Sequence, residues 1–114
     1  MTVWQSLLAQ KKVVRSLHIE AGQLSYYRPN GAITRIYIDD LARAELRLIN
    51  HQLYWYLLDE SGAFALIPET GTQIGLLRRY LSSWRGFNYD GLLRFDPSTD
   101  QQLLLWPLLD RRVA

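Results

Sequence analysis

Three arginines and a tryptophan around position 80 are the residues whose types and spacing could bind a charged ligand. The group consists of Arg78, Arg79, Trp84 and Arg85. On a helix, Arg78 and Arg85 lie seven residues apart and stack along one edge. Guanidinium groups beside an aromatic ring can bind a phosphate or an acidic partner. The commoner role of such residues is a solvated helix face whose arginine stems cover apolar surface, and we favour that interpretation.

The histidines and the acidic pair make no catalytic or metal-binding motif. His18 lies in a strand-like run, where we expect a partly buried, hydrogen-bonded residue, and His51 lies in a predicted turn. Neither has a metal-ligand partner two or four residues away. Asp39 and Asp40 are neighbours, so on a strand they would point to opposite faces, and we expect turn residues. No catalytic residue, metal ligand or cofactor site is therefore predicted.

Aromatic and leucine residues in two strand-like segments predict a different kind of surface. Alternation sends Tyr54 and Tyr56 to one face of their strand and Trp55 to the other. One helix can cover only one face of a sheet, so the other face needs another partner. A closing strand contributes Leu105 and Trp106. We expect one of these strands to contact a protein partner or a second copy of the chain in a homodimer.

Length and composition limit the classes of protein to consider. The chain has 114 residues and no cysteine, and its net charge is +2. This length predicts a single domain over 1–114. The short apolar N-terminal stretch is followed, and not preceded, by Lys11 and Lys12, which is unlike a signal peptide. We therefore expect a cytoplasmic protein with no membrane partner. Because the charge is nearly balanced, we do not favour a nucleic-acid partner.

Turn residues divide the chain into strand-like runs and one helical run. Strands are expected over 13–20, 23–27, 33–38, 53–57, 63–67 and 102–106, with a short helical turn within 88–95. The segment 40–49 is ambiguous, because its helix propensity is high and Asp39 could cap a helix. Strict alternation of Arg43, Glu45 and Arg47 with apolar residues favours a strand with one wet face, and Asn50-His51 would then turn a hairpin.

The main helix is predicted over about 70–84. Ile74, Leu77 and Leu81 recur at three- and four-residue spacing, which marks the buried face. Thr70 or Thr72 could cap its start, and Gly86 could end it in the left-handed conformation.

The order of these features resembles a known group of proteins. A strand run ends in Asp39-Asp40-Leu41, an aromatic strand holds Tyr54-Trp55-Tyr56, and a helix precedes Trp84-Arg85-Gly86-Phe87-Asn88. Over about 13–106 this resembles small, uncharacterised bacterial proteins with a pleckstrin-homology-like sheet and helix. The segment after the helix departs from the leucine-proline-glycine-phenylalanine-aspartate pattern of that group. The resemblance implies a fold and no activity.

These observations predict an α+β domain, in which a bent antiparallel sheet or partial barrel of six to seven strands packs against the helix. The preferred function is a non-catalytic interaction module of a bacterial cytoplasmic protein, able to self-associate and without a cofactor. The alternative is a small enzyme whose Asp, His, Ser and Arg side chains come from distant segments. A third interpretation is a phosphate or nucleic-acid binder that uses the helix arginines.

Overall fold

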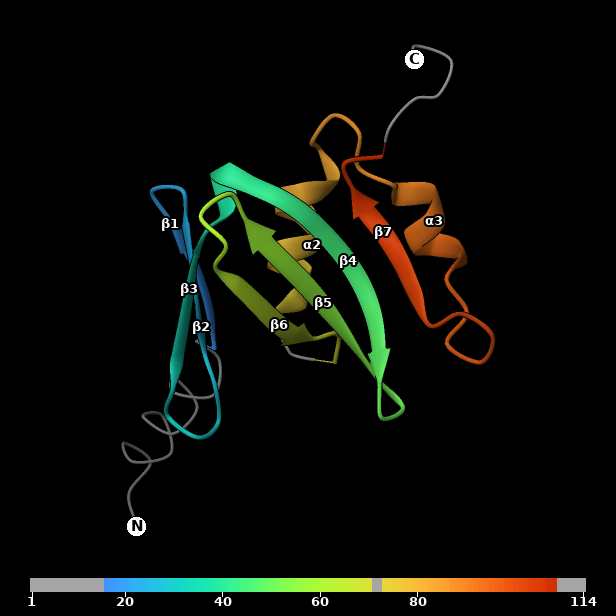
Figure 1. The fold of residues 1–114 in the computed structure, drawn as a ribbon, viewed down its shortest axis with the longest axis horizontal. Helices are drawn as coiled ribbons and strands as arrows, with labels where there is room; N and C mark the ends of the chain where they lie inside the picture. Colours follow the sequence, from blue (N-terminus) through green and yellow to red (C-terminus); the bar gives the residue numbers. More distant parts are fainter. Residues whose placement is uncertain (1–15, 71–72, 109–114) are drawn as a thin grey trace, which may run out of the picture.

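The computed structural model describes residues 16–70 and 73–108, and these residues form an α+β fold with antiparallel sheets and one main helix. The strands are β1 (Leu17–Glu20), β2 (Gln23–Tyr27), β3 (Ile33–Tyr37), β4 (Leu41–Ile49), β5 (Gln52–Asp59), β6 (Phe64–Pro68) and β7 (Gln102–Trp106). The helices are α2 (Ile74–Ser82), α3 (Tyr89–Arg94) and a short 3-10 turn, η1 (Ile38–Asp40). Figure 1 shows β4 and β5 in front of α2, with β1, β2 and β3 to one side.

The strands divide between two sheets, which corrects the expectation of one bent sheet or partial barrel. One sheet has the order β1-β2-β3 and the other β6-β5-β4-β7, and neither sheet is closed. The two sheets meet where β3 approaches β6. There the backbone N–H of Tyr37 donates to the Asp59 carboxylate, at 2.9 Å, and not to the backbone of β6. At this point the Asp59 side chain, and not the backbone of β6, accepts the hydrogen bond from β3.

Two hairpins have the two-residue turns that suit twisted antiparallel strands. Ala21 and Gly22 join β1 to β2, and Asn50 and His51 join β4 to β5, all four with positive φ. Such turns match the right-handed twist of the strands that they connect. The strand interpretation of 41–49 is therefore confirmed, and its helix propensity is overridden by pairing with β5. The Asn30-Gly31 turn is longer, and only Gly31 has a positive φ.

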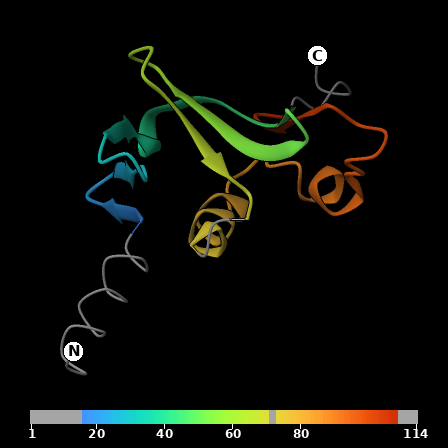
Figure 2. The ribbon, with the colours of Figure 1, turned by 90° about the horizontal axis from the view of Figure 1, so that it is seen from below.

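Register assigns each side chain of the four-stranded sheet to a face. Leu46 pairs with Trp55 and Trp55 with Ile67, so these side chains share one face, and all three are buried. α2 covers this core face through Leu77 and Leu81, which are fully buried in the same apolar cluster. Figure 2 shows α2 and α3 on the same side of the sheet. The core therefore lies between the four-stranded sheet and α2, and Leu17, Leu24 and Ile36 of the three-stranded sheet extend it.

The main helix has the predicted buried face but a different start. Gln73 occupies the position before Ile74 and makes no side-chain capping bond. Thr72, one of the predicted caps, lies outside the described residues, and Thr70 lies several residues before the helix. Gly86 has φ +87°, as predicted for the helix end, but it lies beyond Ser83, which caps the last turn.

The edge strand β7 is covered by the segment that follows α2. The Asn88 side chain donates to the backbone oxygen of Leu104 at 3.0 Å, and its backbone N–H donates to the oxygen of Leu105 at 2.7 Å. The backbone N–H of Leu108 donates to the oxygen of Gly86. Covering an edge in this way blocks pairing with another chain. No helix within 16–70 and 73–108 is both long and apolar enough to cross a bilayer.

Candidate functional site

The side of the four-stranded sheet that faces away from α2 carries a largely apolar and aromatic surface, which we call the outer face. Paired residues share a face, so the register groups its side chains into cross-strand rows. The outer face consists of Arg43, Glu45, Arg47, Tyr54, Tyr56, Leu58, Phe64, Leu66 and Leu104. No described helix or strand lies over it in either view (Figures 1 and 2). Exposed apolar patches of this kind mark interaction sites.

A buried carboxylate lies at the centre of the outer face. Glu45 is 2% exposed, and it accepts hydrogen bonds from Arg43 and, at 2.8 Å, from Arg47. The Arg47 guanidinium also lies 3.8 Å from the centre of the Tyr56 ring. Each guanidinium has five N–H donors, and one carboxylate cannot use them all. Arginine donors and a charge excess of +1 therefore remain available beside the aromatic rings.

The pKa of Glu45 reflects this arrangement. Burial acts to raise the pKa of the carboxyl, but hydrogen bonds from Arg47 and Arg43, and their positive charges, outweigh burial and lower it. Glu45 is thus held as an anion between two cations. The sequence pattern predicted a wet polar face for this strand, and the structure instead shows that a charged residue of that face is shielded by its neighbours.

The predicted self-association residues divide between the outer face and the core. Tyr54 and Tyr56 share one face of β5, as alternation predicts, and this is the outer face, where both are half-buried. Trp55 and Leu105 are fully buried in the core. Trp106 packs against Trp84, with their rings 5.2 Å apart. The two tyrosines are therefore the predicted residues that lie on the outer face, and Trp106 is half-buried against Trp84.

The four residues predicted to bind an anion, Arg78, Arg79, Trp84 and Arg85, do not form one free surface. Arg78 pairs with Glu69, and Trp84 packs between Tyr80 and Trp106. Arg79 and Arg85 are exposed. Two of the four residues are therefore engaged in packing or pairing within the fold.

Glu69 connects the helix to the central tryptophan of the core. Its carboxylate accepts hydrogen bonds from the Trp55 indole N–H and from Arg78. Trp55 also stacks on Phe87, with ring centres 6.5 Å apart. This network satisfies the one polar group of a fully buried indole, and it explains why Arg78 faces Glu69.

Neither histidine lies in a catalytic arrangement. His18 is exposed and contacts Glu20 at 2.8 Å, which corrects the expectation of a partly buried residue. His51 is an exposed turn residue, as predicted. Asp39 accepts a hydrogen bond from the Tyr80 hydroxyl at 2.5 Å, which raises the pKa of that tyrosine. Among the described residues, no group of three His, Cys, Asp or Glu side chains could hold a metal ion.

Asp59 connects the two sheets. It is 2% exposed, and Oδ1 accepts hydrogen bonds from the Ser61 hydroxyl at 2.6 Å and from the backbone N–H groups of Ser61 and Ala63. Oδ2 accepts the bond from Tyr37 of β3. Burial acts to raise the pKa of Asp59, but these hydrogen bonds together lower it. One carboxylate therefore orders the β5–β6 turn and anchors the end of β3.

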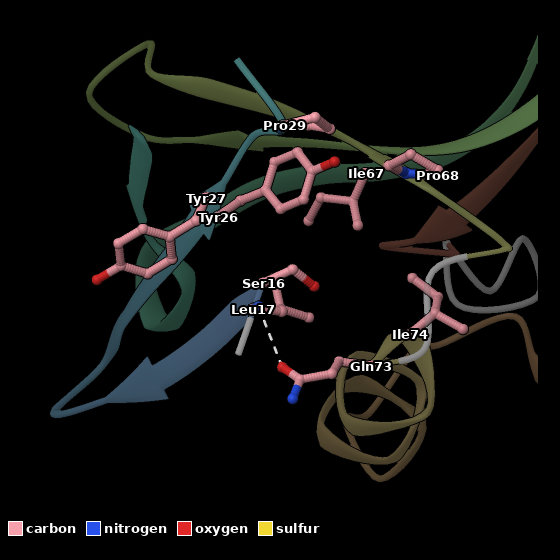
Figure 3. Close-up of a pocket in the computed structure, with 9 residues that line it drawn as sticks. All are labelled: Ser16, Leu17, Tyr26, Tyr27, Pro29, Ile67, Pro68, Gln73 and Ile74. Atoms are coloured by element: carbon pink, nitrogen blue, oxygen red, sulfur yellow. Dashed lines mark hydrogen bonds between the residues drawn. The ribbon is translucent and has the colours of Figure 1, made fainter. Parts of the chain in front are cut away.

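Two cavities lie at the junction between the sheets. One, of about 190 Å³ and open to solvent on one side, is lined by residues of β1, β2, the end of β6 and the start of α2, and Figure 3 shows its lining. Across it the backbone N–H of Leu17 donates to Gln73 Oε1 at 3.0 Å. The other, of about 520 Å³, lies between the β2–β3 hairpin and β6. Neither histidine lines either cavity.

Sequence reasoning did not identify Glu45 and Asp59 as buried charges. The signal for Glu45 was present, because an acidic residue between two arginines at i−2 and i+2 places all three on one strand face. For Asp59 the signal was its position two residues before Ser61, which is typical of an Asx turn. Its contact with Tyr37 spans 22 residues and has no local signal.

Comparisons of the chain with protein-family models, with curated proteins and with solved structures give no match.

Proposed function

We propose that the chain is a non-catalytic interaction module, and that its outer face packs against the outer face of a second copy in a symmetric homodimer. The observation that carries this proposal is an uncovered sheet face rich in tyrosine and leucine, directly opposite the face that α2 covers. A two-fold dimer uses the same patch on both copies and covers both at once.

The flat area of the outer face is of the same order as one side of a dimer interface. The four strands lie about 4.8 Å apart and rise about 3.4 Å per residue, which gives the face a flat area of roughly 450–600 Å². Side-chain relief makes the accessible area larger than this. A stable interface of standard size buries about 800 Å² on each partner.

The polar groups of the outer face suit a second copy. Arg43 and Arg47 have surplus donors, whereas Tyr54 and the flanking Gln52 and Gln102 supply neutral oxygen acceptors. The charge excess of +1 on each copy opposes association modestly. Because salt screens such repulsion, we expect the dimer to strengthen, and not to weaken, as ionic strength rises.

Leu104→Arg is expected to weaken the dimer by at least about tenfold, because it adds a third cation to each copy of the outer face. The fold should tolerate it, since Leu104 lies directly opposite Glu45 and the new guanidinium gains a carboxylate neighbour. Sedimentation velocity measures the dimer fraction. Leu93→Arg is the matched control, because Leu93 is 67% exposed on α3, away from the outer face.

Equal dissociation constants for Leu104→Arg and Leu93→Arg would contradict the proposed interface. A chain that stays monomeric at every concentration would contradict self-association, and would leave the outer face to a different protein.

The nucleic-acid alternative predicts a different result. We expect no tight binding of duplex DNA at physiological salt, because the charge is nearly balanced and Arg78 is paired with Glu69. Fluorescence anisotropy with a labelled duplex tests this. Sub-micromolar binding that falls steeply with salt would favour the nucleic-acid interpretation, and Arg79 and Arg85 would then be the residues to replace.

Two further expectations belong to the proposal. A cytoplasmic location is supported by the lack of cysteine, since disulfides are rare in that compartment. The pleckstrin-homology-like resemblance is supported by the combination of antiparallel sheets with one main helix. Neither expectation implies an activity, because one fold hosts many functions.

A further inference from the structure

The junction between the sheets presents two strand edges with unused backbone groups. Asp59 N–H donates to the Ala63 oxygen and Glu69 N–H to the Leu53 oxygen, so odd-numbered residues of this segment bond to β5. Antiparallel strands alternate between bonding their neighbour and facing away from it. Phe64 and Leu66 therefore direct their N–H and C=O groups to the free edge of β6. Neither residue has a backbone hydrogen bond at that edge to any other described residue.

The edge of β3 that faces β6 also has backbone groups without a partner strand. Arg28 N–H donates to the Ala32 oxygen, and Tyr37 N–H points away to Asp59, so Ile33 and Arg35 direct their backbone groups outward. Unlike β7, whose edge is covered by Asn88, these two edges are open within the described part of the chain. An open edge is a template for another extended segment.

Between these edges lies the larger cavity, which we call the seam groove. It measures about 520 Å³ and is lined by Arg28, Ile33, Thr34 and residues 62–66. This volume falls within the roughly 300–1,000 Å³ of typical ligand pockets. Ile33 and Phe64 are 44% and 53% exposed at its rim. The seam groove thus offers both backbone donors and apolar contacts.

The charge that lines the seam groove is positive. Arg28 is held in its wall by two hydrogen bonds from its guanidinium to the Thr34 hydroxyl, at 2.7 and 3.1 Å. No acidic residue is among the described residues that line the groove. A fixed guanidinium with remaining donors suits a carboxylate.

We propose that the seam groove binds an extended peptide segment of a partner protein, which adds as a strand to the free edge of β6 and places an acidic side chain on Arg28. Main-chain hydrogen bonds to Phe64 and Leu66 give such a complex its affinity, and pockets for alternate side chains give it specificity. The partner therefore carries alternating apolar residues with at least one Asp or Glu.

A phage library of random twelve-residue peptides, selected on the immobilised full-length chain, is the probe. We expect enriched peptides to alternate apolar residues and to share an acidic position. With the synthesised peptide bound, the amide hydrogens of Phe64 and Leu66 should exchange more slowly than in the free chain. Ile33→Glu should weaken binding at least about tenfold, since it removes apolar contact and repels the acidic peptide.

Leu93→Glu is the matched control, and it should leave peptide affinity unchanged. Leu104→Arg should not weaken peptide binding, because Leu104 does not line the groove. Phe64 and Leu66 belong to both surfaces, so loss of the dimer can only raise the affinity for the peptide. The proposal is overturned if no peptide is enriched, or if the bound peptide protects amides elsewhere and not those of Phe64 and Leu66. It is equally overturned if Ile33→Glu and Leu93→Glu bind the peptide alike.

Discussion

Leu77→Ala and Leu81→Ala are each expected to lower the free energy of unfolding by about 2–5 kcal/mol. Both side chains are fully buried between α2 and the four-stranded sheet. Truncation removes apolar contacts and leaves a cavity that the surrounding strands can fill only in part. Denaturant midpoints, with an unchanged slope, measure the loss.

Arg79→Ala is the matched control on the same helix. Arg79 is exposed on α2, and its replacement should change the free energy of unfolding by no more than about 0.5 kcal/mol. Alanine also has the higher helix propensity, which offsets part of any loss. Similar midpoints for all three variants would contradict the assignment of the helix faces.

Asp59→Ala is expected to destabilise the fold by about 2–4 kcal/mol, because it removes a buried carboxylate that accepts hydrogen bonds from the backbone N–H groups of Tyr37, Ser61 and Ala63. The loss should be largest where the sheets meet, so the amides of β3 should exchange faster. Glu60→Ala is the control, since Glu60 is the exposed neighbour in the same turn. An equal effect of the two substitutions would show that the carboxylate does not hold the sheets together.

The same carboxylate predicts a dependence of stability on pH. The folded pKa of Asp59 lies below its ordinary value of 3.8, so the unfolded chain binds the proton more tightly. The contribution of Asp59 is therefore fully present above about pH 5, and it is lost as pH falls through 3.8 and then through the lower folded pKa. The wild-type chain should lose more stability in this range than Asp59→Ala does.

Local sequence patterns predicted the elements and their faces well. The alternation around Trp55 separated that side chain from its tyrosine neighbours, and the structure buries Trp55 in the core and places the tyrosines on the outer face. Alternation alone did not say which of the two faces the helix covers. Periodicity identified Leu77 and Leu81 as the buried face of α2. β7 is an edge strand and ends directly before Pro107, a residue that cannot donate a ladder hydrogen bond. Each of these predictions depends only on residues within a few positions of one another.

Long-range contacts decided what the sequence could not predict. Where the two sheets meet, Tyr37 bonds to Asp59, and no propensity of either residue specifies that pairing. Arg78 has the helical position of a solvated arginine, yet it pairs with Glu69, whose carboxylate also accepts a hydrogen bond from the Trp55 indole. Trp84 lies in a segment chosen as a binding surface, but its ring packs on Trp106, which is 22 residues away.

Sedimentation velocity of the wild-type chain across a micromolar concentration series tests the proposed interaction module most directly. We predict a dimer whose fraction rises with concentration and with salt, and slower amide exchange at Tyr54 and Tyr56 in the dimer than at low concentration. A single monomer at every concentration and salt, with exchange at these two tyrosines unchanged, would contradict self-association through the outer face.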